Sequence, residues 1–60
     1  MEKTTVTMQE YAFLSLSKTL HRINLIVDKL KNDTIIESVT INFDDGYWVG
    51  KIFYKEYEEE

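Results

Sequence analysis

The sequence predicts an α+β domain in which one long N-terminal helix packs on a C-terminal antiparallel β-hairpin, as a homodimer. Three observations indicate this fold. Apolar residues recur at helical spacing over residues 8–31, apolar and polar residues alternate after residue 32, and Asp45-Gly46 divides the alternating part. The 60 residues leave room for a single domain over 1–60, with the helix at about 8–31, the hairpin at about 34–57 and an acidic tail at 58–60.

The predicted helix begins at Thr7-Met8-Gln9-Glu10, which matches a capping box. In a capping box the first and last side chains each bond the backbone N–H of the other residue. No Gly or Pro interrupts residues 8–31, and Asn32-Asp33 is a suitable stop, because Asn tolerates the left-handed conformation that often ends helices. We therefore expect one helix of about 24 residues, roughly 36 Å long.

Asp45-Gly46 predicts a hairpin with a two-residue type I′ turn. This turn places Phe43 opposite Trp48 and gathers the apolar residues of both strands on one face. The same register places Glu37 opposite Tyr54, as the one break in that face. A two-stranded sheet is marginal by itself, so we expect either a second protomer or a short edge strand at Thr4 to Val6.

Composition excludes several function classes. The chain has no Cys and one His, which argues against disulfides, thiolate metal sites and His-rich zinc clusters, and we expect no cofactor. The net charge is −4, with eight acidic residues after position 31, so direct binding to nucleic acid or anionic membranes is disfavoured. No apolar run approaches the roughly 20 residues of a membrane span, no secretion signal is apparent, and we expect a cytoplasmic protein.

No catalytic set emerges from the sequence. His21 is the only residue of the type best suited to general-base chemistry near neutral pH, and Ser17 lies four residues before it on the predicted helix. Nothing at a suitable spacing supplies an orienting carboxylate or an oxyanion hole. A surface or interface histidine is the simpler interpretation, so the sequence predicts no enzyme activity.

The outer face of the hairpin is the predicted binding surface. Its aromatic and aliphatic side chains alternate with lysines, and aromatic anchors dominate interface energetics. Asp44 and Asp45 are either turn formers or contacts, and the acidic tail is either a solvated end or a contact for a basic partner. The residues predicted to bind a partner are Val49, Lys51, Phe53, Tyr57, Asp44, Asp45, Glu58 and Glu59. A second set is predicted to self-associate, from the far side of the helix and the outer hairpin face: Tyr11, Leu14, Leu25 and Ile36.

The opening Thr5-Val6-Thr7-Met8-Gln9-Glu10-Tyr11, followed by a Leu-rich helix and a hairpin, resembles small accessory proteins of bacteriophages and other mobile elements of low-GC Gram-positive bacteria. The resemblance implies a non-enzymatic inhibitor that occupies a host or defence protein, as anti-CRISPR proteins do. The acidic C-terminal half suits a target with a basic nucleic-acid-binding cleft. Two alternatives remain open: a self-assembling structural subunit, and a small DNA-binding regulator whose hairpin carries Lys51 and Lys55 into a groove.

Overall fold

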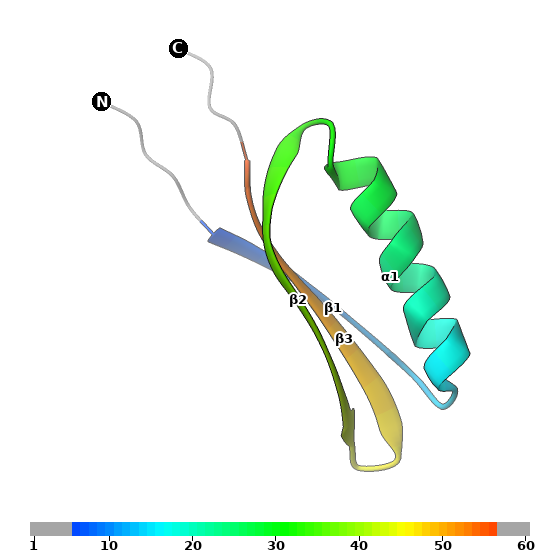
Figure 1. Ribbon diagram of the computed structural model, residues 1–60. Coiled ribbons are helices and arrows are strands. Elements are labelled where there is room, and N and C mark those ends of the chain that lie inside the picture. Colours follow the sequence, from blue (N-terminus) through cyan, green and yellow to red (C-terminus); the bar gives the residue numbers. More distant parts are fainter. Residues whose placement is uncertain (1–5, 57–60) are drawn as a thin grey trace.

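The computed structural model describes residues 6–56, which form three strands and one helix in one small α+β unit. The order along the chain is β1 (Val6–Phe13), α1 (Leu16–Leu30), β2 (Thr34–Asp44) and β3 (Tyr47–Glu56). The strands form an antiparallel sheet in the order β1-β3-β2, so the last strand in the chain is the central one. Figure 1 shows α1 alongside one face of this sheet, with no other element of residues 6–56 against the opposite face.

The prediction of a long N-terminal helix on a hairpin is wrong, because the helix lies between strands. Residues 6–13 form β1, which pairs with β3 from Val6 opposite Lys55 to Phe13 opposite Trp48. The predicted capping box at Thr7 to Glu10 is therefore part of a strand. An N-terminal edge strand does exist, but it extends far beyond the predicted Thr4 to Val6, of which only Val6 lies in the described range.

The helix begins at Ser15, which is its N-cap. The Ser15 backbone is extended, and its Oγ accepts from the backbone N–H of Lys18 at 3.5 Å. At the other end, the Thr34 hydroxyl donates to the Leu30 carbonyl oxygen at 2.6 Å. Asn32 does not adopt the predicted left-handed conformation, because Asp45 is the only non-glycine residue with positive φ among residues 6–56.

The predicted hairpin is confirmed over most of its length. Asp45 and Gly46 have φ of 53° and 85°, the positive values that a type I′ turn requires at both central positions. The register from Asp44 opposite Tyr47 to Ser38 opposite Phe53 is as predicted. Beyond Ser38 the prediction is wrong, because a bulge between Ile36 and Ser38 leaves Glu37 unpaired.

The bulge changes which residues of β2 face the helix. Ile36 pairs with Tyr54, and Ile35 pairs with Lys55, whereas an unbroken register places Glu37 opposite Tyr54 and Ile36 opposite Lys55. The extra residue thus removes the carboxylate of Glu37 from the covered face and brings the aliphatic side chain of Ile36 into it.

The core lies between α1 and the central strand, and it is small. Only Ile23, Ile52 and Tyr54 are buried apolar residues among those described. A Cβ built on Gly50 lies 2.7 Å from Cγ1 of Ile23, so glycine at this position lets the helix approach the sheet. A chain of this size gains little from such a core, which makes the uncovered surfaces important.

Candidate functional site

The predicted partner-binding residues of the central strand lie together on the uncovered side of the sheet, which we call the open sheet face. Val49, Lys51 and Phe53 alternate along β3 with residues that face the helix. Phe53 lies between Met8 of β1 and Ser38 of β2 in the sheet register. The neighbouring strands leave all three side chains half-buried, and no described element covers them.

Several large apolar side chains share this face. Met8 is 43% exposed and Val6 52% exposed, although the sequence pattern had suggested a helical position for Met8. Ile35 and Tyr47 are exposed on the same side at the two ends of the sheet. Exposed apolar side chains gathered on one surface are typical of interaction sites. The apolar members of the open sheet face are Val6, Met8, Ile35, Tyr47, Val49 and Phe53.

Charged groups on the open sheet face lie in pairs of opposite sign. Glu10 of β1 is directly opposite Lys51 in the register. The Nζ of Lys55 lies 3.5 Å from Oε2 of Glu37, the bulged residue of β2. Both lysines of the hairpin therefore have a carboxylate nearby, which leaves this face without a basic patch.

A hollow of about 320 Å³ lies at the hairpin end of the open sheet face. Its walls include the carboxylates of Glu10 and Asp44, the Asn42 amide and the Lys51 ammonium group. Asp45 occupies the turn beside it, where its positive φ makes it a turn former. Asp44 thus lies at the edge of the candidate surface, whereas the predicted Tyr57, Glu58 and Glu59 lie outside the described residues.

The predicted self-association residues do not form one surface. Tyr11 is not on a helix at all, and it packs against the core from β1 on the covered face of the sheet. Ile36 also packs against the core, because the bulge turns it inward. Leu14 is 74% exposed in the connection before α1, and Leu25 is exposed on α1 itself.

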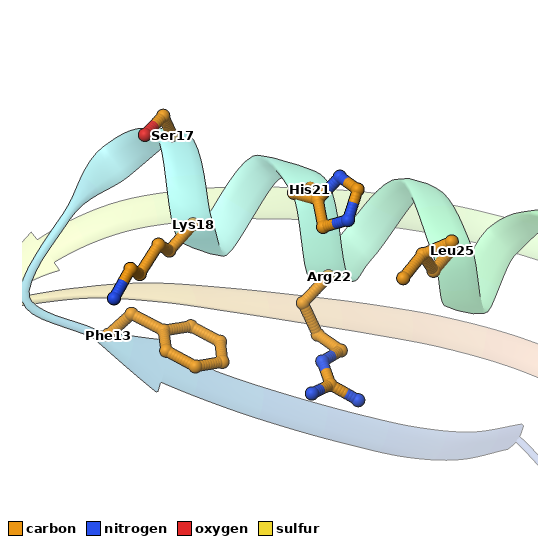
Figure 2. Close-up of a pocket in the computed structure, with 6 residues that line it drawn as sticks. All are labelled: Phe13, Ser17, Lys18, His21, Arg22 and Leu25. Carbon is orange, nitrogen blue, oxygen red and sulfur yellow. The ribbon is translucent and has the colours of Figure 1, made fainter.

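A cationic groove that the sequence analysis missed runs between α1 and β1. It has a volume of about 500 Å³ and is lined by Phe13, Ser17, Lys18, His21, Arg22 and Leu25. Figure 2 shows Lys18 and Arg22 extending from α1 toward β1 on either side of the Phe13 ring. The sequence feature that could have indicated this groove is the absence of Asp and Glu from residues 11–27.

The Arg22 guanidinium group lies 5.8 Å from the centre of the Tyr11 ring, which is within cation–π range. The Tyr11 hydroxyl donates to Oε1 of Gln9, and the Gln9 amide nitrogen donates to the Tyr54 hydroxyl at 2.9 Å. These contacts connect the rim of the groove to the core. Arg22 therefore has a structural role, because it packs on the Tyr11 ring.

Ser17 and His21 both line the groove, at the i and i+4 positions of α1. The Ser17 hydroxyl lies 3.0 Å from the Ser15 hydroxyl, and no hydrogen bond joins Ser17 to His21 among the described side chains. Within residues 6–56, no group of three His, Cys, Asp or Glu side chains is placed to hold a metal ion. In the same range no helix is long and apolar enough to cross a membrane.

Comparison with protein-family models finds no matching family, and searches of curated proteins and solved structures find no match.

Proposed function

We propose that this chain is a non-enzymatic protein-binding module that uses the open sheet face to bind its partner. The single observation that carries the proposal is the uncovered sheet, where Phe53, Val49 and Met8 form an apolar centre. Interfaces are organised in this way, with apolar or aromatic anchors surrounded by polar residues. Glu10 and Lys51 supply a polar pair beside the centre.

The narrower form of the proposal is an inhibitor or regulator that occupies a host or defence protein with a basic cleft. Its support is charge, because the chain carries −4 overall and Asp44 and Asp45 lie at the hairpin end of the sheet. Within the segment that resembles phage accessory proteins, Val6 to Tyr11 lie in β1 and not in a capped helix. The phage-type role therefore rests on the sequence resemblance and on the charge of the chain.

The DNA-binding alternative receives little support from this geometry. Lys51 faces Glu10 across the β1–β3 pair, and Lys55 forms an ion pair with Glu37. Counterion release by lysines provides most non-specific affinity for a phosphate backbone, and carboxylates beside both lysines repel that backbone. Binding that weakens steeply as salt increases would favour this alternative.

The test is an affinity capture from a nuclease-treated bacterial lysate with the tagged wild-type chain, Phe53→Ala and Leu14→Ala. Leu14 is the matched control, because it is an exposed apolar residue outside the sheet. We expect one stoichiometric protein with the wild type and with Leu14→Ala, and its loss with Phe53→Ala.

The captured protein is then purified and titrated against each variant by calorimetry. Truncation of a central anchor is expected to raise Kd about thirtyfold, as for a typical hot-spot residue. Circular dichroism checks that Phe53→Ala is folded, and Met8→Ala gives a second test with an exposed side chain. Equal binding by all variants would refute the open sheet face as the site.

A further inference from the structure

The helix α1 leaves part of its own side of the sheet uncovered, and this gap lies over β2. Val39 and Phe43 point to the helix side, since they pair with Ile52 and Trp48, yet they remain 41% and 60% exposed. The Phe43 ring lies 5.0 Å from the Trp48 ring, so an aromatic pair borders this gap. On α1, Leu16 and Leu20 are exposed as well.

The gap adjoins an open strand edge, because β2 is an outer strand of the sheet. The segment from Ser38 to Phe43 has no charged residue, no Pro and no Gly. Proteins usually protect such an edge with charges or prolines. The other outer strand, β1, carries Glu10 in its interior, so the two edges differ in this respect.

The turn geometry indicates which backbone groups of β2 point to the open edge. The two-residue turn makes Asp44 and Tyr47 a hydrogen-bonded pair, and such pairs alternate along an antiparallel ladder. Val39, Ile41 and Phe43 therefore belong to non-hydrogen-bonded pairs with β3. Their N–H and C=O groups point away from β3, toward the edge.

We propose that two copies of the chain pair through this edge as a twofold dimer, with β2 antiparallel to β2 of the second copy. The bulge at Ile36/Ser38 ends the regular edge on one side, and the turn after Asp44 ends it on the other. A segment that spans Ser38 to Asp44 pairs with itself around Ile41. Val39 of each copy then lies opposite Phe43 of the other.

In the proposed register, compatible side chains meet across the interface on both faces of the sheet. On the helix side it makes β-branched and aromatic cross-strand pairs, Val39 with Phe43 and Ile41 with Ile41, which are favourable combinations. On the open sheet face it places Thr40 opposite Asn42, so polar side chains meet there. The paired segment from Ser38 to Phe43 is uncharged, which lets two copies of a chain of net charge −4 meet without facing like charges at its centre.

The dimer also supplies burial that one copy lacks. Among residues 6–56 each copy buries three apolar residues in its core, and small domains commonly gain stability by association. Twofold pairing keeps both helices on the same side of one continuous sheet. Each helix brings the exposed Leu16 and Leu20 to that side. The open sheet face remains free on both copies and can bind a partner independently.

The test uses charge substitutions that depend on register. Val39→Glu with Phe43→Glu places two carboxylates opposite each other at both ends of the pairing. We expect this double variant to raise the dimer dissociation constant about tenfold or more, measured by sedimentation over a wide dilution range. Val39→Lys with Phe43→Glu restores opposite charges across the interface, so it is expected to dimerise more tightly than the first double variant.

The control is Val6→Glu with Met8→Glu, which adds the same charge at comparably exposed positions on the other outer strand. It is expected to dimerise like the wild type. A monomeric wild type at about 100 µM, well above the Kd of a specific dimer, would overturn the proposal. Equal dissociation of the two Val39/Phe43 double variants would overturn the register.

Hydrogen exchange gives a readout that does not depend on substitutions. The amide protons of Val39, Ile41 and Phe43 are expected to become protected as concentration increases, whereas that of Thr40, bonded to β3, is protected throughout. Fast exchange at Ile41 in a dimeric sample would place the interface elsewhere. None of these measurements involves a partner protein, so failure of the dimer leaves the proposed binding function separately testable.

Discussion

The hydroxyl of Thr19 donates a hydrogen bond of 2.8 Å to the carbonyl oxygen of Trp48, which joins the first turns of α1 to the central strand. Thr19 has no exposed surface, and its Cγ2 lies 3.0 Å from the Cβ position of Gly50. One buried polar residue thus fixes the height and position of the helix over the sheet.

Replacing Thr19 with Val tests this bond. The substitution retains the shape but removes the donor, leaving the Trp48 carbonyl without this partner. We expect the free energy of unfolding to fall by about 1 kcal/mol, the net contribution of a typical intramolecular hydrogen bond. Urea denaturation at one fixed protein concentration measures the change, and an unaltered midpoint would show that the bond contributes nothing.

Gly50→Ala tests the close approach of helix and sheet. The added methyl group would lie 2.7 Å and 2.8 Å from Cγ1 and Cδ1 of Ile23, so the Ile23 side chain or the helix must move. We expect a loss of about 1–3 kcal/mol of stability from overpacking, read from thermal unfolding. Gly50→Ala with Ile23→Val removes one of the clashing atoms, and failure to recover any stability would contradict the steric explanation.

Ser15→Ala and Thr7→Ala locate the true start of the helix. Ser15 is the N-cap of α1, whereas Thr7 lies in β1 and pairs with Tyr54. We expect Ser15→Ala to cost about 1 kcal/mol through loss of helix capping. Carbon chemical shifts of residues 16–19 report helix formation, and they should respond to Ser15→Ala only. If these shifts responded to Thr7→Ala instead, the result would support the longer helix that the capping box predicts.

Deletion of Glu37 tests the bulge. Because Glu37 is the unpaired residue, its removal leaves Ile36 opposite Tyr54 and Ser38 opposite Phe53, and every side chain keeps its face. We expect a folded protein whose stability changes by less than about 1 kcal/mol, as for substitutions outside the core. Nuclear Overhauser contacts between Ile36 and Tyr54 check the register, and an unfolded deletion variant would mean that the strand is continuous.

The hairpin could be predicted from the sequence because two independent signals agree there. The alternating residues of 38–53 and the Asp45-Gly46 turn specify the same register, and a slip of one residue would turn every side chain to the wrong face. The sequence also contains an indication of the bulge, because Glu37 is the one carboxylate among the apolar residues that the predicted register places on one face. A two-versus-one pairing at that position removes it from the core.

The first half could not be predicted because its residues suit two structures. Val6–Phe13 alternates between half-buried and exposed positions as a strand, but its apolar residues also extend the helical spacing that continues to Leu30. The partner that decides between them is β3, about 40 residues later in the chain, and a local pattern contains no information about it. The true boundary at Ser15 also lacks a Glu or Gln three residues later, because Lys18 stands there.

The candidate surface was predicted only in part for the same reason. Val49, Lys51 and Phe53 follow from the hairpin register, so their common face was accessible from the sequence. Met8 and Val6 join them only because residues 6–13 form a strand. The cationic groove of Lys18 and Arg22 likewise needs β1 beside α1.

The position of β3 at the centre of the sheet also determines when this protein folds during synthesis. β1 and β2 do not pair with each other, and both depend on β3 for their ladders. Residues 6–44 are synthesised before β3, so neither β1 nor β2 has its partner strand during that interval. We therefore expect no folded intermediate on the ribosome and a single cooperative step once residues 47–56 emerge, with the uncharged edge of β2 exposed to chaperones until then.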